Sequence, residues 1–355
     1  MINTTPERNI IDTFAQISWQ DLSIKTIQST QCPTTFTVNY PTYHHRCNLS
    51  QQIQKQLGLT QSQPVTIRTQ IERHKPQGML QPLKKIKNII AICANKGGVG
   101  KSTIATNIAA SLAQGGHTVG LLDADLYGPN QPELLGINSK ALIENNQYQP
   151  IQSHGISLMS MGVLVDEKTP LVWRGPMASN YFQQMVFNTN WPALDYLILD
   201  CPPGTGDILL TMTQKVPIAG VVLVHTPQCL SISDAIKGIH MLRKMQVPIL
   251  GAIENMAGFR CVHCDQINHI FPETMADQLQ KLQIEQINQI PLSKALVDSS
   301  EMGKPLVCNL PNDSTSLLIH QIATQIAARL ACRPISTRNI STHTKQQTTE
   351  SITTS

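Results

Sequence analysis

Short runs of apolar residues recur through the middle of the chain, and each is long enough to form one strand. Neighbouring positions within a run are both apolar, which is typical of strands covered on both faces, as in a parallel sheet. Between the first two runs apolar residues recur at helical spacing, and Gly115 and Gly116 end that pattern. The runs are 89–93, 119–122, 196–199, 220–224 and 249–253. We therefore predict an α/β domain over residues 88–332, with a doubly wound, mostly parallel sheet that holds ligands at the carboxyl ends of its strands.

The segments on either side of this domain have different patterns. Residues 1–80 combine polar helix-like stretches with one alternating run, Phe36–Tyr40, and predict a small α+β domain. Residues 81–87 carry a proline and a run of lysines and are expected to form a linker. Residues 333–355 are rich in Ser, Thr and Gln with almost no large apolar residue, so they are predicted to form a disordered tail.

Composition adds limits on the class of protein. The 355 residues are 41% hydrophobic, and the formal net charge is only +4, with the basic residues spread along the chain. We therefore expect neither nucleic acid nor an anionic membrane as a partner. The chain has no apolar run of signal-peptide or membrane-span length, which favours a soluble, cytoplasmic protein. Its nine cysteines are scattered, which is typical of buried, metal-binding or catalytic cysteines and not of a disulfide framework.

A glycine-rich segment lies between the first apolar run and the helix predicted over 102–114. Its glycines let the backbone wrap phosphate groups with several N–H groups pointing inward, and the helix N-terminus adds partial positive charge. Lys101 is expected to reach the β- and γ-phosphates, and the Ser102 hydroxyl to ligate Mg²⁺. The segment consists of Lys96, Gly97, Gly98, Val99, Gly100, Lys101, Ser102 and Thr103. It predicts a binding site for a nucleoside triphosphate with Mg²⁺.

One position of this P-loop departs from the usual pattern. The common form has a glycine five positions before Gly100, where this chain has Asn95. Because Asn tolerates a left-handed backbone better than most residues, we expect the loop to keep its shape.

Acidic residues follow two of the predicted strands. Asp200 ends the run 196–199 and precedes a proline- and glycine-rich segment that reaches Asp207. A carboxylate there is placed to hold the water shell of Mg²⁺, and the glycines after it allow a loop that senses the γ-phosphate. Asp123 and Asp125 end the run 119–122, where one carboxylate can orient the attacking water. Helix capping is the alternative role at both places.

Five further motifs follow one another in a fixed order over about residues 86–310. They are Asp123–Pro129, Trp173–Met177, Asp200–Asp207, Thr226–Gln228 and Glu254–Met256. On these motifs the chain resembles the ApbC-type iron–sulfur cluster carriers of the Mrp family, which are grouped with the nitrogenase iron protein and the MinD and ParA ATPases.

The resemblance implies an ATP-hydrolysing homodimer. It gives Lys96 the role of the lysine that crosses the dimer interface to the partner's nucleotide in the deviant Walker A group, beside Lys101 in the same loop. It favours Asp125 as the residue that orients water, and it matches Asn255 with the residue that recognises adenine. Residues 1–80 resemble a weakened copy of the small SUF-associated domain, but its acidic Asp-Pro-Glu motif is absent, which puts a docking role in doubt.

Cys261 and Cys264 form a Cys-x-x-Cys pair in a predicted loop. Thiolates at this spacing suit Zn²⁺ or an iron–sulfur cluster, although about 0.2 such pairs are expected by chance in a chain with nine cysteines. Two cysteines cannot complete a four-thiolate site, but a symmetric dimer supplies two more. The resemblance implies a [4Fe–4S] cluster held between subunits and delivered to apoproteins.

The surroundings of this pair differ from the family pattern at Val262–His263 and at Phe271–Thr274. Structural zinc, or no metal, therefore stays open, with His263 and His269 as alternative ligands. Cys93 and Cys201 are expected to pack and not to ligate a metal.

Two other functions remain open at this point. One is a MinD- or ParA-like positioning ATPase, which wants a basic amphipathic helix or a strongly basic face; the tail shows neither. The other is a nucleotide-switched scaffold that carries no cluster.

Overall fold

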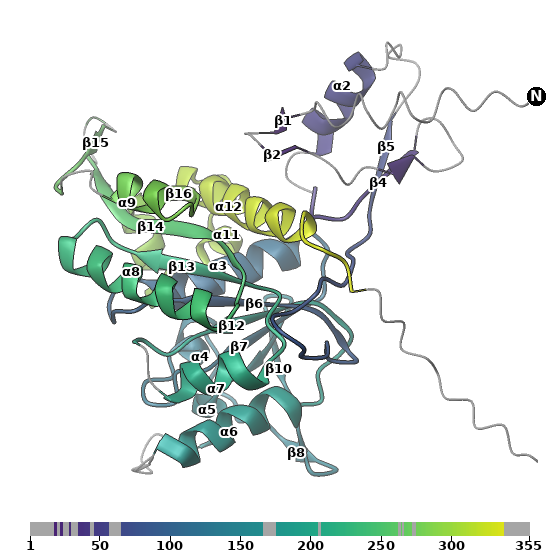
Figure 1. Ribbon diagram of the computed structural model, residues 1–355, viewed down its shortest axis with the longest axis vertical. Coiled ribbons are helices and arrows are strands. Elements are labelled where there is room, and N and C mark those ends of the chain that lie inside the picture. Colours follow the sequence, from purple (N-terminus) through teal and green to yellow (C-terminus); the bar gives the residue numbers. More distant parts are fainter. Residues whose placement is uncertain are drawn as a thin grey trace, which may run out of the picture.

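The computed structural model shows a central sheet with flanking helices (Figure 1). Trp173, Arg174 and the Thr205–Gly206 pair of the family motifs lie outside its described residues. The described residues are 18–19, 22–23, 28–29, 35–42, 46–56, 65–165, 175–204, 207–261, 264, 266–271 and 275–336.

The sheet has nine strands, in the order β10-β11-β7-β12-β6-β13-β14-β15, with β16 also paired to β14. Only the pairs β10–β11 and β14–β15 are antiparallel, and the other pairs are parallel. The strands are β6 Ile86–Cys93, β7 Val119–Asp123, β10 Ile151–Ser153, β11 Ile156–Met159, β12 Leu194–Asp200, β13 Gly220–His225, β14 Ile249–Arg260, β15 Ile267–Asn268 and β16 Gln286–Leu292. The predicted mostly parallel, doubly wound sheet is confirmed.

Helices connect these strands and cover the sheet. They are α3 Lys101–Gln114, α4 Gln131–Leu134, α5 Met161–Leu164, α6 Gly175–Phe187, α7 Asp207–Lys215, α8 Cys229–Lys244, α9 Met275–Lys281, α10 Lys294–Glu301, α11 Leu306–Asn309 and α12 Ser314–Ala331. Helix α12 packs on α3, where Ser111 Oγ lies 2.7 Å from His320 Nδ1. Within the part of the chain that the structure describes, no helix has the length and apolar character needed to cross a membrane.

All five predicted apolar runs lie within strands of this sheet. Asp123 and Asp200 are the last residues of β7 and β12, so both carboxylates lie at the carboxyl edge. Strand β6 begins at Ile86, inside the segment expected to be a linker, because its first residues pair with the neighbouring strand. Lys87 Nζ lies 2.8 Å from Asp195 Oδ1 there, so charged side chains support the start of the strand.

The N-terminal segment has a small sheet of its own, separate from the nine-stranded one. It consists of β3 Gln28–Ser29, β4 Thr35–Val38 and β5 Thr66–Thr69, with helix α2 Arg46–Gln56 between β4 and β5. Two further strand pairs are β1 Ser18–Trp19 with β2 Leu22–Ser23, and β8 Ile143–Glu144 with β9 Gln147–Tyr148. Val38, Leu49, Ile53 and Ile67 are buried. The Asn39 amide donates to the Ala331 carbonyl at 3.3 Å, which links this segment to the end of α12.

The chain just after α12 is paired with a segment near residue 74. Lys75 N donates to Pro334 O at 2.9 Å and Ser336 N donates to Arg73 O at 2.8 Å. Residues 333–336, expected to belong to a disordered tail, therefore make regular backbone contacts, which need no large apolar side chains. The rest of the tail lies outside the described residues.

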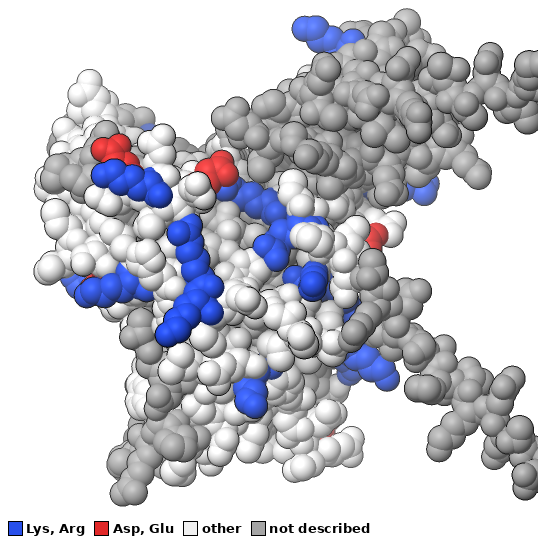
Figure 2. Space-filling model, in the orientation of Figure 1, with Lys and Arg blue, Asp and Glu red and all other residues white. Residues whose placement is uncertain are grey.

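Charged side chains are unevenly distributed on the face shown in Figure 2. Lys and Arg outnumber Asp and Glu there and lie in separate groups. The last turn of α8 carries two basic residues, Arg243 and Lys244. Cations at a helix C-terminus interact favourably with its partial negative charge, so these two also stabilise α8.

Candidate functional site

The glycine-rich loop lies between β6 and α3, as predicted. Gly98 and Gly100 have φ angles of 77° and 81°, in the left-handed region that favours glycine. A Cβ atom on Gly100 would lie 2.3 Å from Asn255 Nδ2, so a larger residue would also clash with β14. The helix begins at Lys101, one residue earlier than predicted, with Gly100 as its N-cap. The N–H groups of its first turn therefore face the loop.

A cavity of about 430 Å³ opens above this loop. It is lined by all eight residues of the predicted segment and by Asp125. Pro203 and Met256, from the motifs Asp200–Asp207 and Glu254–Met256, also line it. The lining residues that the sequence did not indicate are Asn130, Glu133, Leu134, Ser300 and Glu301. The cavity is of a size found for small-molecule ligand sites.

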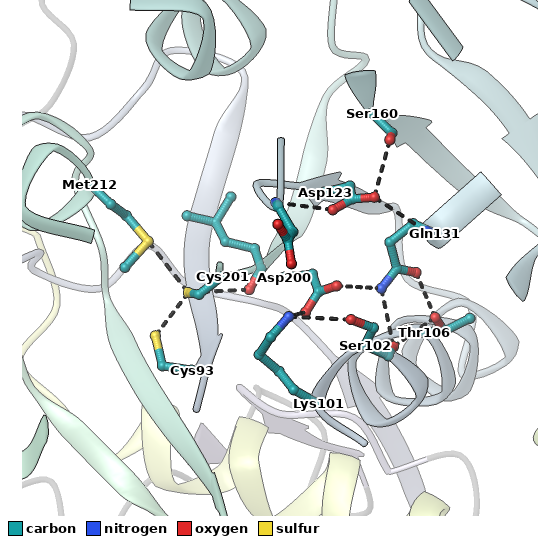
Figure 3. A network of polar contacts seen from close by, with 12 residues as sticks. Cys93, Lys101, Ser102, Thr106, Asp123, Gln131, Ser160, Asp200, Cys201 and Met212 are labelled. Carbon is teal, nitrogen blue, oxygen red and sulfur yellow. Dashed lines mark hydrogen bonds and ion pairs between the residues drawn. The ribbon is translucent and has the colours of Figure 1, made fainter. Parts of the chain in front are cut away.

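Lys101 and Asp200 form a buried ion pair at the floor of the site (Figure 3). Their side chains are 8% and 0% exposed, and Lys101 Nζ also lies 3.2 Å from Ser102 Oγ. Burial lowers the pKa of the Lys101 ammonium, but the attraction and hydrogen bond of Asp200 outweigh it, so this pKa is raised overall. Lys101 therefore stays charged, beside the two oxygen-bearing side chains expected to hold Mg²⁺.

Gln131, on α4, organises the other side of Asp200 and was not found from the sequence. Its amide nitrogen donates to Asp200 Oδ2 at 2.8 Å and to the Ser102 carbonyl at 3.1 Å. Its amide oxygen accepts from Thr106 Oγ1 at 2.6 Å. The side chain is fully buried, so one glutamine ties β12 to the first turn of α3 (Figure 3). No spacing pattern marks a single glutamine of this kind in a sequence.

Asp123 ends β7 and Asp125 follows the strand, and the two carboxylates have different surroundings. Asp123 is fully buried and accepts from Gln131 N at 3.2 Å and Ser160 Oγ at 3.1 Å. Burial, and then the nearby Asp200, raise the pKa of Asp123 to about 8. Asp125 lines the cavity, and its pKa is raised by burial. Asp123 is thus a buried structural group whose pKa lies well above that of an exposed carboxyl, and Asp125 is the one that faces the ligand space.

Asn95 and Asn255 both hold the loop through their side chains. Asn95 was expected to replace the usual glycine because Asn tolerates a left-handed backbone, but it does not adopt that backbone here. Its amide donates to the Asp234 carbonyl on α8, and Gly238 of the same helix leaves room for it. The Asn255 amide donates to the Val99 carbonyl at 2.8 Å. In this structure Asn255 therefore supports the loop, and the cavity wall beside it is formed by Met256.

The cysteine pair lies in a hairpin at one end of the sheet (Figure 1). Strand β14 ends at Arg260, and β15 returns antiparallel to it. Cys261 N donates to Gln266 O at 2.9 Å, which closes the turn. Cys261 is half-buried and Cys264 is exposed; His263 lies outside the described residues. The predicted loop position of the pair is therefore observed.

Metal ligands near this pair are few. His269 is exposed, and its Nδ1 lies 3.1 Å from the Ala257 carbonyl, which holds the ring against β14. Over the described residues, no three His, Cys, Asp or Glu side chains gather where they could hold a metal ion. The hairpin alone thus offers two thiols.

Strand β14 connects the hairpin to the nucleotide cavity. Asn255 contacts the P-loop, Met256 lines the cavity, and Cys261 directly follows the last residue of the strand. A fully extended chain from Asn255 to Cys261 would span about 20 Å at roughly 3.3 Å per residue, and the path here is shorter because Met256 has a φ of 58° and the register with β16 shifts between Asn255 and Phe259. One continuous strand therefore bears on both sites.

The chain is similar in sequence to known proteins. The family model described as the NUBPL iron-transfer P-loop NTPase matches residues 85–327, which include both the loop and the cysteine pair. The chain is 44% identical over 266 residues to an iron-sulfur cluster carrier protein of Pseudomonas fragi, covering 74% of this chain and 93% of that protein. It is 40% identical over 258 residues to the iron-sulfur cluster transfer protein NUBPL of Mus musculus, covering 72% and 81%.

Solved structures agree with the fold. A nucleotide-binding protein of Archaeoglobus fulgidus, in complex with ADP, matches with a TM-score of 0.56 and 34% identity over 63% of this chain and 89% of that one. The cell division ATPase MinD of Pyrococcus furiosus matches with a TM-score of 0.52 and 22% identity, over 67% and 98%, which concerns the fold alone. The resemblance drawn from the motifs is thus confirmed, and the chain belongs to the NUBPL-type iron-transfer family of P-loop NTPases.

Proposed function

We propose that this protein binds and hydrolyses ATP and carries an iron–sulfur cluster, which it transfers to apoproteins. The observation that carries this proposal is the continuity of β14 between the nucleotide cavity and the Cys261–Cys264 hairpin. The names of its relatives, iron-sulfur cluster carrier and transfer proteins, support the same reading. Strand β14 supports the proposal as a physical route by which one site could affect the other.

The phosphate groups of ATP would lie on the loop 96–103. Lys101 is charged and needs only to turn from Asp200 to contact them, and the N–H groups that begin α3 face the same space. The Ser102 hydroxyl and the Asp200 carboxylate both lie next to Lys101 Nζ, so two hard oxygen donors converge where Mg²⁺ would be held. A bound Mg²⁺ would neutralise phosphate charge.

Hydrolysis needs a group that orients water and a second cation near the γ-phosphate. Asp125 lines the cavity and is our candidate for the first role. Lys96 lines the same cavity, and we assign it to the nucleotide of a second copy across a homodimer interface. Asn255 would contact the adenine once its present bond to Val99 rearranges.

The cluster is cargo in this proposal, and the hairpin is its carrier site. Each chain contributes Cys261 and Cys264, so two chains related by symmetry supply the four thiolates that a [4Fe–4S] cluster wants. An exposed hairpin leaves such a cluster accessible to an acceptor protein. We place the protein in the cytoplasm, where reduced thiols such as Cys261 and Cys264 would be available to bind a cluster.

The deciding experiment is anaerobic reconstitution of the full chain with iron and sulfide. We expect one labile cluster per dimer, loss of nearly all iron in Cys261→Ser, and normal iron in Cys229→Ser, whose cysteine is exposed as Cys264 is. Transfer is then followed as activation of an apoprotein acceptor. Equal iron in all three proteins, or zinc in place of iron, would defeat the carrier role.

A further inference from the structure

Three sulfur atoms meet beneath the nucleotide site, on the side of Asp200 away from Gln131 (Figure 3). The Cys93 thiol donates to Cys201 Sγ at 2.8 Å, and the Cys201 thiol lies 3.4 Å from Met212 Sδ. Cys93 is 3% exposed, and the other two residues are fully buried. None of these sulfurs has a role in nucleotide or cluster binding as described above.

The register of the sheet brings the two cysteines together. Strands β6 and β12 are parallel neighbours with Asp200 opposite Ile92, and Cys201 N donates to the Ile92 carbonyl at 3.1 Å. Cys201 follows Asp200 and Cys93 follows Ile92, so the two cysteines lie side by side. Neighbouring strands lie about 4.8 Å apart, which is within the Cα separation of about 4.4–6.8 Å that a disulfide spans. The two thiols need little backbone movement to bond.

We propose that Cys93 and Cys201 are a site of reversible covalent modification, in which a small peroxide oxidises them to a disulfide. Closing the bond brings the sulfurs from 2.8 Å to about 2.05 Å, a shift of less than about 1 Å. The bond would join the last residue of β6, which leads into the P-loop, to the residue that follows Asp200.

The chemistry balances with one molecule of hydrogen peroxide. The sulfur of Cys93, the more exposed of the two, gives up two electrons as the O–O bond breaks, one water leaves, and a sulfenic acid remains. The Cys201 sulfur then attacks the Cys93 sulfur. The S–S bond forms as the S–O bond breaks, and the hydroxyl leaves with the Cys201 proton as a second water. A thiol reductant reverses the change by exchange.

Burial restricts which reagents can reach this pair. Cys93 is 3% exposed and Cys201 is fully buried, so bulky alkylating reagents do not reach either sulfur while the protein stays folded. Because reactive cysteines are partly exposed, oxidation of this buried pair is slow. A peroxide is close to water in size and can enter through local opening. Resistance to alkylation together with sensitivity to peroxide is the signature of this site.

The bond would restrain the nucleotide site. Gly204 N already donates to the Ala94 carbonyl at 3.2 Å, so the loop after Asp200 and the start of the P-loop are in contact. A loop that senses the γ-phosphate must move relative to the P-loop. A covalent link between Cys93 and Cys201 would limit that movement. This consequence rests on the proposed ATPase, whereas formation of the bond does not. We expect ADP to bind as before and ATP turnover to fall about tenfold, in line with the cost of small misplacements in active sites.

The test exposes the reduced full chain to hydrogen peroxide, blocks remaining thiols after unfolding, and maps linked peptides by mass spectrometry. We expect a Cys93–Cys201 linked peptide that dithiothreitol abolishes. It should be absent from Cys93→Ala and from Cys201→Val, and present in Cys308→Ala, a control at a half-buried cysteine elsewhere. Peroxide treatment that gives no such peptide, or further oxidation of either cysteine without a link, overturns the proposal.

ATP turnover is measured on the same samples. Loss in the parent protein that dithiothreitol reverses, with no loss in Cys93→Ala, supports the coupling; equal loss in both proteins overturns it. The measurement is repeated in the Cys261→Ser/Cys264→Ser background, so that cluster damage cannot contribute. A linked peptide in a protein without any ATP turnover when reduced would instead refute the proposed ATPase and leave the modification site standing.

Discussion

The nucleotide site and the cysteine hairpin share strand β14, but they are built in opposite ways. Around the phosphate loop, charged and polar side chains are buried and bonded to one another, with Lys101, Asp200 and Gln131 in one network. At the hairpin, Cys264 is exposed, and the returning strand β15 has only two residues. A site made from the core is coupled to folding stability, whereas a site at a sheet edge can change with little effect on the fold.

Lys101→Ala should have the largest effect of any single change, because it removes the proposed phosphate ligand and leaves Asp200 buried without its cation. Breaking a buried ion pair in this way costs about 3–5 kcal/mol of unfolding free energy. We expect about 3 kcal/mol in urea unfolding, since Gln131 still donates to Asp200. Calorimetry should show that ATP binding is lost.

A double variant separates these two losses. Lys101→Ala with Asp200→Asn removes the unpaired buried charge, so most of the stability should return while ATP binding stays lost. If the single variant is as stable as the parent protein, Lys101 and Asp200 are not coupled to folding, and the contrast with the hairpin fails.

Asp123 should make stability depend on pH. Its raised pKa means that the folded state keeps a proton that the unfolded state releases above about pH 4, so this residue's contribution falls as pH rises from about 4 to about 8. Asp123→Asn removes the effect. The free energy of unfolding of the variant minus that of the parent should rise by about 1 kcal/mol per pH unit between pH 5 and pH 7. Asp277→Asn, at an exposed position, is the matched control and should show no such trend.

Gln131→Ala tests the part of the network that the sequence did not indicate. It removes the donor to Asp200 and the acceptor for Thr106 inside the core, and an unsatisfied buried group costs about 1–3 kcal/mol. We expect about 2 kcal/mol less stability and slower ATP turnover, because Asp200 is no longer held. Gln147→Ala, at an exposed glutamine, should stay within about 0.5 kcal/mol. Equal stability of the two variants would remove Gln131 from the site.

The phosphate loop could be predicted because its chemistry is written in consecutive residues. Gly98, Gly100 and Lys101 are close in sequence, and the strand and helix beside them follow from apolar spacing. Both-face apolar runs likewise predicted five strands of the sheet. Strands β10, β11, β15 and β16 were missed, since they are short or carry polar residues such as Ser157, Gln286 and Asn288. Their pairing is decided by the neighbouring strand and not by their own composition.

Contacts between distant segments could not be predicted. Cys93 and Cys201 are 108 residues apart and meet only because β12 lies next to β6 in the sheet. Gln131 reaches Asp200 across 69 residues for the same kind of reason. Asn95 was expected to be tolerated for its backbone freedom, but its side chain packs on α8 instead. Each case depends on strand order, which local patterns do not specify.

The smallest expected effect is at the hairpin, and it completes the contrast with the core site. Cys261→Ser and Cys264→Ser change sulfur to oxygen at half-buried and exposed positions. We expect the free energy of unfolding of the cluster-free proteins to change by less than about 0.5 kcal/mol in urea titrations, and ATP binding to stay as in the parent. The same variants should lose their iron, so function at the hairpin would be lost while the fold is kept. A drop of several kcal/mol, comparable to that of Lys101→Ala, would mean that the hairpin is part of the folding core after all.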